Sequence, residues 1–599
     1  MTAGILTRGV DVLSALRLAA QAAASANRRL AVGVGVLAVV GSALTVAVAL
    51  VSQEIVDSAT TGQAVLLAAG LFGAYAIATL CLEWLNTGLT TTLAEATDHW
   101  LESTLARCVL APPGLDHVEN SEYQNQVHVL LNQRGALGGT VNTVVGATTL
   151  AVRFVVAEVL LARISPVLLV FPLFIVPTIA ISGRTQRLLS RSLTAVAERT
   201  RLATMFFQTA SDPAAGRELR VYGLGPEVVR RHTDLLLEVD EEQWAARLKS
   251  SLLEGATWAF FAAGLVGAIF FAVHDGRAQH SPAELLLLFV LAAQIAGQTK
   301  TASFVVGSIG RQTDAFRRYR HVRDVADRYR GSSADAPAPD RLEHGIDLVD
   351  VELRYAGASE PALRGVSCHL PAGATVALVG PSGAGKSSLV KLLLGLYEPT
   401  AGSVNVDGVP LSAIDHGRWR ERTAAAFQDF TRFELTLLES VGVGDLPRST
   451  DEVAVAGALR RAEAGSLVQH WDDGLQTRLG RSHADGVEPS EGQWQKVAIA
   501  RAMLRDAPLL TVLDEPTASL DAESEYDLFH AYRRSARDRA HRTGGITVLV
   551  SHRFVTVRDA DLILVIDGGR VVESGTHDEL VRLGGRYARL FETQAGEYR

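Results

Sequence analysis

Apolar positions are distributed unevenly along this chain: long uninterrupted runs fill its first half, and short runs alternate with helix-like segments in its second half. The hydrocarbon core of a bilayer is about 30 Å thick, so a helix that crosses it needs roughly 20 apolar residues. Runs that approach this length predict six transmembrane helices at Leu30–Val51, Ala64–Thr90, Leu137–Leu161, Val167–Ile181, Leu252–Val273 and Ala283–Val306.

Basic residues near the ends of these runs predict how the helices are oriented. The connection after the first run contains Glu54 and Asp57 but no lysine or arginine, which is typical of an external loop. The N-terminal segment and the connection Ser182–Ser251 are flanked by Arg8, Arg17, Arg28, Arg29, Arg184, Arg187, Arg191, Arg247 and Lys249. These segments, and the long connection Thr91–Ala136, are therefore expected in the cytoplasm.

The first run lacks a cleavage site after a short apolar core, so we expect it to be a retained anchor. The pattern predicts a multi-pass protein of the cell membrane.

Three ionisable residues interrupt the predicted membrane helices. Glu83 lies in the second helix, and Arg153 and Glu158 lie in the third. Such groups are costly in hydrocarbon unless they face protein or a water-filled cavity. Five residues at about 100° each place Arg153 and Glu158 on different faces, so they are not expected to pair with each other. They are candidates for a substrate cavity, and the alternative is polarity between packed helices.

The second half of the chain has the pattern of an α/β domain. A stretch from Gly331 to Pro339, GSSADAPAP, is typical of a linker. After it, helix-like segments alternate with strand-like runs at Thr375–Val379, Leu509–Leu513, Ile546–Val550 and Leu562–Ile566. We predict an N-terminal cytoplasmic segment (1–28), a helical membrane domain (29–325), a linker (326–345) and a nucleotide-binding domain (346–599).

Charge and cysteine content narrow the possible functions. The net charge is -8 and no basic tail is present, so nucleic acid is not expected as a partner. Cys81, Cys108 and Cys368 are scattered and show no CxxC spacing, which disfavours a disulfide framework or a zinc site. A location of the second half in the reducing cytosol agrees with this pattern.

The strongest chemical signal is a phosphate-binding loop. Residues Gly380–Ser387, GPSGAGKS, match GxxxxGK[ST] directly after an apolar strand and before a helix-like segment. In such a loop the backbone N–H groups surround phosphates, Lys386 reaches the outer phosphates, and Ser387 offers its hydroxyl to Mg²⁺. The candidate nucleotide contacts here are Gly380, Ser382, Gly383, Gly385, Lys386, Ser387 and Ser388.

Two acids follow a buried strand about 130 residues later. The strand Leu509–Leu513 leads directly into Asp514 and Glu515. Adjacent side chains of a strand point in opposite directions, so the two acids are expected to have different roles. We assign Asp514 to the Mg²⁺ shell and Glu515 to the activation of the attacking water.

The order of motifs around this loop resembles the ATP-binding-cassette (ABC) family, and the resemblance covers the whole chain. It implies that Tyr355 stacks on adenine and that Gln428 links Mg²⁺ and water to the membrane domain. It also implies that Ala518–Asp521 is the D-loop, whose Asp521 lies at the nucleotide, and that His552 contacts the γ-phosphate.

The signature of that family, usually LSGGQ, reads PSEGQ at residues 489–493. The resemblance implies that Ser490, Gly492 and Gln493 contact ATP held by a second subunit. Ser490 and Gln493 also match the S-x-x-Q capping box that starts ordinary helices, and the two interpretations are compatible. Glu491 departs from the pattern, because it adds a carboxylate where a triphosphate is expected.

The resemblance implies an all-α, six-helix membrane domain of exporter type followed by an α/β P-loop ATPase, with ATP and Mg²⁺ as cofactors. One cassette per chain implies a second half-transporter, in a homodimer or a heterodimer. Similar exporters move peptides, lipids or other small amphipathic molecules, and Glu218–Gly223 is expected to be a coupling helix. The alternatives are an importer of the siderophore type and a nucleotide-gated sensor. Lys386, Asp514, Glu515 and His552 disfavour the sensor, since sensing needs no hydrolytic turnover.

Overall fold

The computed structural model describes residues 2–60, 65–132, 138–164, 171–274, 282–330, 336–515, 522–551, 553 and 557–597. Contacts divide the chain into two compact units. The first, which we call the helical unit, comprises Met1–Arg107 and Gln126–Arg323, and the second, the cassette unit, comprises Cys108–Asn125 and Asp324–Arg599. The cassette unit thus includes a short segment that lies far upstream of it in the sequence.

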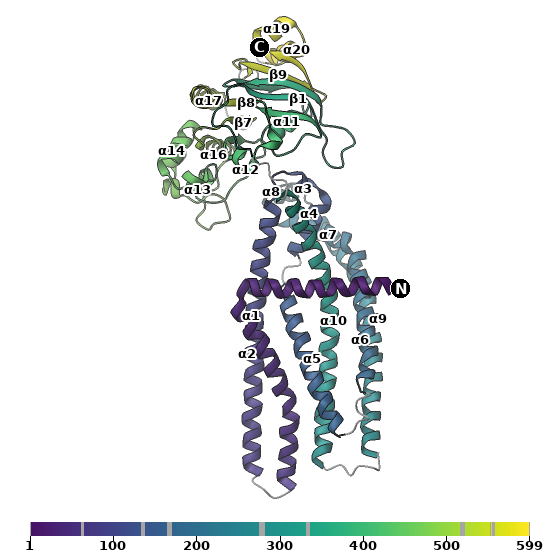
Figure 1. Cartoon of the computed structure of the whole chain (residues 1–599). Coiled ribbons are helices and arrows are strands. Elements are labelled where there is room, and N and C mark those ends of the chain that lie inside the picture. The colour runs from purple at the N-terminus through teal and green to yellow at the C-terminus, as the bar shows by residue number, and fades with distance from the viewer. Residues whose placement is uncertain are drawn as a thin grey trace. The chain divides into compact units, whose positions relative to one another are not determined.

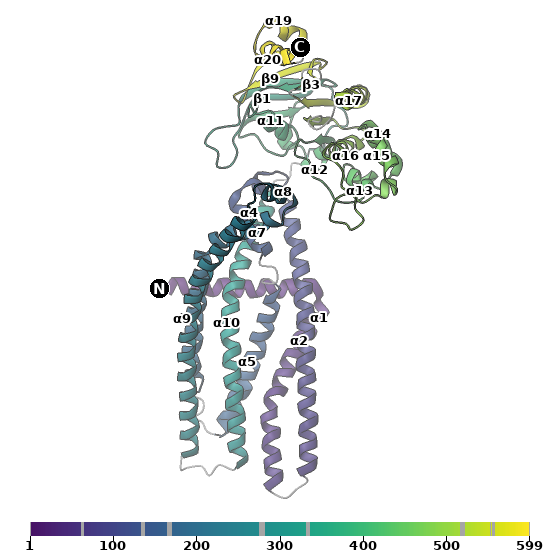
Figure 2. The ribbon, with the colours of Figure 1, turned by 180° about the vertical axis from the view of Figure 1, so that it is seen from behind.

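Long helices form the helical unit, and each contains the described part of one predicted membrane run. They are α1 (Thr2–Thr60), α2 (Val65–Leu110), α5 (Gly139–Ile164), α6 (Phe171–Ala195), α9 (Gly225–His274) and α10 (Pro282–Arg330). Figures 1 and 2 show most of them running side by side, whereas the N-terminal part of α1 lies across the others. The change of direction in α1 falls at Asn27, which leaves helical geometry at φ -158° and ψ 95°. Its side chain accepts a hydrogen bond from the backbone N–H of Leu30 at 3.1 Å and so caps the second part of α1.

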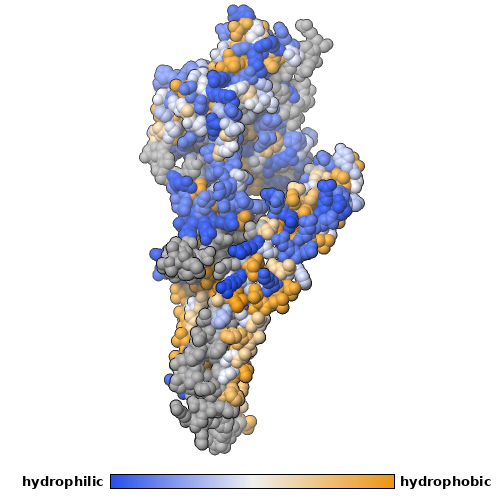
Figure 3. All heavy atoms as spheres, turned by 90° about the vertical axis from the view of Figure 1, so that its right-hand side faces the viewer, coloured by the Kyte–Doolittle hydropathy of each residue, from blue (hydrophilic) through white to orange (hydrophobic). Residues whose placement is uncertain are grey.

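Many large apolar side chains are exposed on the outside of this unit. Leu66, Trp84 and Val155 are among the large apolar residues that point outward, and Figure 3 shows extensive hydrophobic surface along the long helices. Such a surface is unfavourable in water and typical of contact with lipid. Among the described residues, two stretches are long and apolar enough by composition to cross a bilayer, Arg17–Val56 and Gly139–Arg163. Composition alone therefore identifies two of the six predicted spans. The other four are supported only by the long helices that contain them.

The ionisable residues inside the helical unit meet between helices. The guanidinium of Arg153 on α5 lies 2.6 Å from the carboxylate of Glu83 on α2, and it donates to the hydroxyl of Thr45 on α1 at 3.3 Å. This favours polarity between packed helices over a free cavity charge for that pair. Glu158 differs, because both its carboxylate oxygens are buried and have no hydrogen-bond partner among the described residues.

The cassette unit is built on two sheets. A six-stranded sheet has the order β10-β9-β3-β8-β7-β6, in which β10 alone is antiparallel to its neighbour. Its strands are β3 (Thr375–Val379), β6 (Thr423–Ala426), β7 (Leu510–Asp514), β8 (Ile546–Val550), β9 (Leu562–Asp567) and β10 (Arg570–Gly575). An antiparallel sheet with the order β2-β1-β4-β5 comprises β1 (Gly345–Leu353), β2 (Leu363–Pro371), β4 (Ala401–Val406) and β5 (Val409–Pro410).

Helix α11 (Lys386–Leu393) shares one apolar core with strands of both sheets. A second core, centred on the fully buried Trp494, joins α13 (Leu437–Gly442), α14 (Glu452–Arg461), α15 (Gly465–His470) and α16 (Glu491–Leu504). These helices form a group beside the sheet in Figures 1 and 2. The remaining helices of this unit are α3 (Asp116–Glu119), α12 (His416–Glu421), α17 (Ala522–Thr543), α19 (His577–Leu583) and α20 (Arg586–Glu597), with α4 (Ser121–Asn132) shared between the units. The predicted fold class, a helical domain followed by an α/β P-loop domain, is confirmed, and the four predicted strands agree to within one residue at either end.

Candidate nucleotide site

The phosphate-binding loop lies between the end of β3 and the start of α11. Two of its glycines are required by their surroundings. A Cβ on Gly380 would lie 2.0 Å from the carbonyl oxygen of Ile566, and Gly385 adopts φ 109° at the N-cap position of α11. Glycine alone tolerates both constraints without strain. The loop can therefore curl so that its N–H groups and the N-terminus of α11 face one centre.

Lys386, the first residue of α11, spans this loop. Its ammonium donates to the carbonyl oxygens of Gly380 at 2.9 Å and Pro381 at 3.0 Å. Burial lowers the pKa of Lys386, while the negative charges of Glu515 and Asp514 oppose that shift. The side chain is thus held over the loop, beside the two acids that the sequence assigned to catalysis.

Those acids emerge at the carboxyl end of β7. Strands β3, β8 and β7 are parallel neighbours, so their carboxyl ends meet at one edge of the sheet. There the hydroxyl of Ser387 donates to a carboxylate oxygen of Asp514 at 3.4 Å. Burial raises the pKa of Asp514, and the adjacent charge of Glu515 raises it further.

A hydroxyl and a carboxylate are ligands that suit Mg²⁺, which is commonly held by one or two protein groups together with substrate phosphates. Among the described residues no group of three or more His, Cys, Asp or Glu side chains could form a dedicated metal cage. The pair Ser387 and Asp514 therefore fits a magnesium ion that arrives with a nucleotide.

Glu515 has an unusual backbone. Its φ of 48° lies in the left-handed region, which residues other than glycine rarely adopt. Two hydrogen bonds fix it there: its N–H donates to Val550 on β8 at 3.0 Å, and its carbonyl accepts from the side chain of Gln495 on α16 at 3.3 Å. Direct contact thus ties Glu515 to the helix that follows the predicted signature.

The predicted adenine-stacking residue stands at the side of the loop. The hydroxyl of Tyr355 lies 2.9 Å from that of Ser388, and its ring meets the ring of Tyr397 edge to face at 5.1 Å between centroids. The ammonium of Lys391 lies 5.3 Å from the ring centroid of Tyr355 and 5.4 Å from that of Tyr397. Gln428 is exposed just after β6. Ser382 and Gly383 are also exposed, at the tip of the loop.

The predicted signature starts α16 as a capping box. The N–H of Ser490 donates to the side chain of Gln493 at 2.8 Å, and the N–H of Gln493 donates back to the Ser490 hydroxyl at 3.3 Å. Gly492 lies in the first turn, and Pro489 is buried just before the cap. The capping-box interpretation is confirmed, and the N-terminus of a 14-residue helix is directed outward at this point.

The sequence did not reveal that the segment 108–125 belongs to the cassette unit. The N–H of Leu115 donates to the carbonyl oxygen of Leu396 at 2.9 Å. The carboxylate of Glu119 accepts from the ammonium of Lys391 at 2.9 Å and from the hydroxyl of Tyr397. Burial raises the pKa of Glu119, but these two hydrogen bonds outweigh burial and lower the pKa below its usual value. The segment therefore contacts the same two side chains that flank Tyr355.

The segment proposed for coupling lies elsewhere. Glu218–Gly223 spans the end of α8 (Pro213–Val221) in the helical unit, and most of its side chains are exposed. Its role stays a prediction. The D-loop, Ala518–Asp521, and His552 lie outside the described residues, and their contacts stay predictions.

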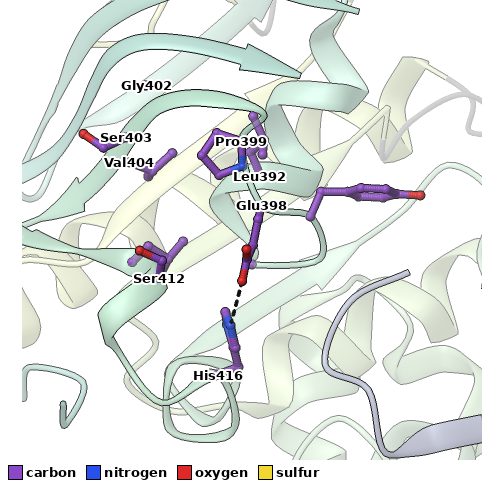
Figure 4. A pocket seen from close by; sticks show the side chains of 11 residues that line it. Leu392, Glu398, Pro399, Gly402, Ser403, Val404, Ser412 and His416 are labelled. Carbon is purple, nitrogen blue, oxygen red and sulfur yellow. Dashed lines mark ion pairs between the residues drawn. The ribbon is translucent and has the colours of Figure 1, made fainter. Parts of the chain in front are cut away.

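A cavity of about 50 Å³ lies near these groups but is separate from the phosphate loop. It is lined by residues that include Leu392, Tyr397, Ser403, Leu411 and His416. Figure 4 shows His416 pointing toward Glu398, and its ring nitrogen lies 3.9 Å from that carboxylate. The cavity is too small for a nucleotide and does not alter the assignment.

Residues 363–518 match the sequence family described as "ABC transporter". This match lies within the cassette unit. An "ATP-dependent lipid A-core flippase" from Burkholderia orbicola (strain AU 1054) is 40% identical over 249 residues, which are 42% of this chain and 40% of that protein. The protein of the same name from Xanthomonas campestris pv. campestris (strain 8004) is 37% identical over 328 residues, which are 52% of this chain and 54% of the relative. The chain thus spans about half the length of the curated relatives it matches.

A solved structure described as "a bacterial Atm1-family ABC exporter with ATP bound" superposes with a TM-score of 0.73. The superposition covers 95% of this chain and 98% of the other, at 21% identity. The chain therefore has the fold of that exporter, with both the helical unit and the cassette unit in one chain.

Proposed function

We propose that this chain is an ABC transporter and one half of an ATP-driven exporter of the cytoplasmic membrane, with its cassette in the cytoplasm. The substrate class that we propose is a lipid-type amphipathic molecule. The proposal rests on the convergence of Lys386, Ser387, Asp514 and Glu515 at one edge of the six-stranded sheet.

In this arrangement each side chain has a distinct task. The loop from Gly380 and the ammonium of Lys386 bind the phosphates, and Tyr355 supports the adenine from the side. Ser387 and Asp514 would hold a magnesium ion, which would supply positive charge to neutralise the phosphates. Glu515, fixed between β8 and α16, orients and deprotonates the attacking water. Gln428, which is exposed just after β6, would link the magnesium ion and water to the membrane domain.

A single chain does not complete the site. The N-terminus of α16 at Ser490 is a second anion-binding device, and it belongs to a different part of the cassette from the loop at Gly380. Two chains arranged head to tail bring the loop of each to the signature helix of the other. We therefore propose a dimer that binds two ATP molecules, closes on them, and resets after hydrolysis.

The helical unit supports the membrane part of the proposal. Its outward side chains are largely apolar, and the charge of Arg153 is compensated by Glu83 within the unit. An apolar outer surface and a compensated internal charge both suit helices that lie in lipid. The flippase names of the relatives agree with a lipid-type substrate.

The test is ATP hydrolysis by the full chain purified in lipid nanodiscs, with the natural sequence compared with Glu515→Gln. Asp538→Asn, which changes an exposed acid on α17 paired with Arg542, is the matched control. We expect activity in the natural chain and the control, and a loss of at least about 100-fold with Glu515→Gln. Reconstituted vesicles then measure ATP-dependent flux of a fluorescent phospholipid.

Equal activity of the natural chain and Glu515→Gln would refute the assignment of the base. Hydrolysis that never couples to flux of any amphipathic probe would instead favour the nucleotide-gated sensor.

A further inference from the structure

The signature helix carries an acid that its proposed task disfavours. Glu491 is the first residue of α16, where a carboxylate stabilises the helix through the helix dipole. The same position lies beside Ser490 and Gly492, which are proposed to receive the triphosphate of the partner chain. A carboxylate next to these residues would repel a triphosphate bound to them. A working signature of this sequence therefore needs a nearby positive charge.

The structure supplies that charge from a separate segment. The guanidinium of Arg432 forms an ion pair with the carboxylate of Glu491, across 59 positions of the sequence. Both side chains remain about half exposed, at 46% for Arg432 and 55% for Glu491. The pair thus lies at the surface where a second chain would approach.

Arg432 is held in place by α16, the helix whose first residue it pairs with. Further along α16, the guanidinium of Arg501 donates to the carbonyl oxygens of Thr431 at 3.2 Å and Ser440 at 2.9 Å. It also lies 4.5 Å from the ring centroid of Phe433. The residues on either side of Arg432 are therefore fastened to α16, which keeps the guanidinium at Glu491.

We propose that Arg432 is a positioning residue: it neutralises Glu491, and so allows a signature helix that begins with an acid to accept the triphosphate of ATP bound to the partner chain. This inference rests on the proposed function, since it requires two cassettes that share each nucleotide.

Four forms of the full chain in nanodiscs test the pair: the natural sequence, Arg432→Ala, Glu491→Gly and the double variant. We expect Arg432→Ala to raise the KM for ATP roughly 10-fold, because it leaves the carboxylate uncompensated. Glu491→Gly should retain natural activity or exceed it. The double variant should resemble Glu491→Gly, since removal of the acid makes the arginine unnecessary.

Arg481→Ala is the matched control. It removes another basic side chain just before α16, one that lies 3.5 Å from Glu488 and is 70% exposed. We expect it to leave the KM unchanged. Arg432→Lys, which retains the charge, should recover most of the loss and shows that Arg432→Ala acts through charge and not through misfolding.

Natural activity of Arg432→Ala would overturn the proposal. So would a double variant as impaired as Arg432→Ala, because Arg432 would then act on the nucleotide or the fold without Glu491. If none of the four forms shows ATPase activity, the proposed function itself is refuted. The failure of this inference and the failure of the proposed function are therefore distinguishable.

Discussion

In the proposed site, the loop side and the signature side of the cassette each present the N-terminus of a helix to phosphate, but the two sides are built differently. Helix α11 begins with glycine at its N-cap and lysine at its first position, and no acid lies in its first turn. Helix α16 begins with a serine cap and a glutamate. The loop follows the family pattern at every position of its motif, whereas the signature departs at Pro489 and Glu491.

The reason for the contrast lies in what surrounds each helix start. The base of the loop is closely packed, because a Cβ added at Gly380 or Gly385 would meet the backbone of Ile566 or Ala362. The signature lies at an exposed surface, where a new charge can be answered by one other side chain. Substitutions are therefore poorly tolerated where the backbone is closely packed, as in the loop. On the exposed signature side, one charged residue can be compensated by another of opposite charge.

The largest expected effect is on the loop side. Lys386→Ala removes the ammonium that spans the loop, so both ATP binding and hydrolysis should fall, with kcat/KM reduced by at least about 100-fold. Equilibrium binding of a fluorescent ATP analogue to the purified chain measures the first effect, and phosphate release measures the second. Unchanged ATP affinity would contradict the proposal that the loop side binds the phosphates of ATP.

A smaller and more selective effect is expected on the signature side. Ser490→Ala removes the cap of α16, which should destabilise that helix by about 1 kcal/mol. Hydrolysis should fall about 10-fold while binding of the ATP analogue at the loop is retained.

Asp451→Ala is the control for this change, since Asp451 caps α14 in the same group of helices by accepting from two backbone N–H groups at 3.0 Å. It should reduce stability by a similar amount and leave hydrolysis nearly unchanged. A similar loss of hydrolysis in both variants would mean that the cap matters only for folding.

The pH dependence of Mg²⁺-nucleotide binding should distinguish Asp514 on the loop side from Glu491 on the signature side. Because burial and Glu515 raise the pKa of Asp514, binding of Mg²⁺ with nucleotide should weaken at a higher pH than an ordinary aspartate would require. Glu515→Gln removes the neighbouring charge and should move the acid limb of Mg²⁺-dependent binding to lower pH. Glu491→Gln should not move it, and a shift of the same size in that variant would contradict the assignment of Asp514.

The smallest effect concerns the anchor of Arg432. Phe433→Leu removes the ring beneath the guanidinium of Arg501, a contact worth about 0.5–1 kcal/mol at such a site. Hydrogen exchange of the amides in residues 428–436 should become faster by a few-fold, with little change at α11. Protection that is unaltered there would mean that Arg501 fastens the segment through its backbone hydrogen bonds alone.

Local patterns in the sequence predicted most of the cassette. Strands β3 and β8 match their predictions at both ends, because buried parallel strands are short, apolar and bounded by turns. The Gly380 loop and the Ser490 capping box were also predicted, since their hydrogen bonds join residues only a few positions apart.

Contacts between distant parts of the chain were not predicted. The pairs Arg432 with Glu491 and Arg153 with Glu83 join residues 59 and 70 positions apart. The attachment of Glu119 to Lys391 spans 272 positions and carries no local signal, because α3 has only four residues. A one-dimensional pattern reports which face of an element is apolar, but it does not report which other element that face will meet.

The left-handed backbone at Glu515 has an evolutionary consequence. A side chain other than glycine or asparagine is destabilising in this conformation by roughly 1–2 kcal/mol, and it is kept only where the side chain is needed. A descendant chain that no longer hydrolyses ATP would gain stability by replacing this glutamate with glycine or asparagine. The glutamate at this position is therefore unfavourable for folding, which is typical of a side chain that serves chemistry and not stability.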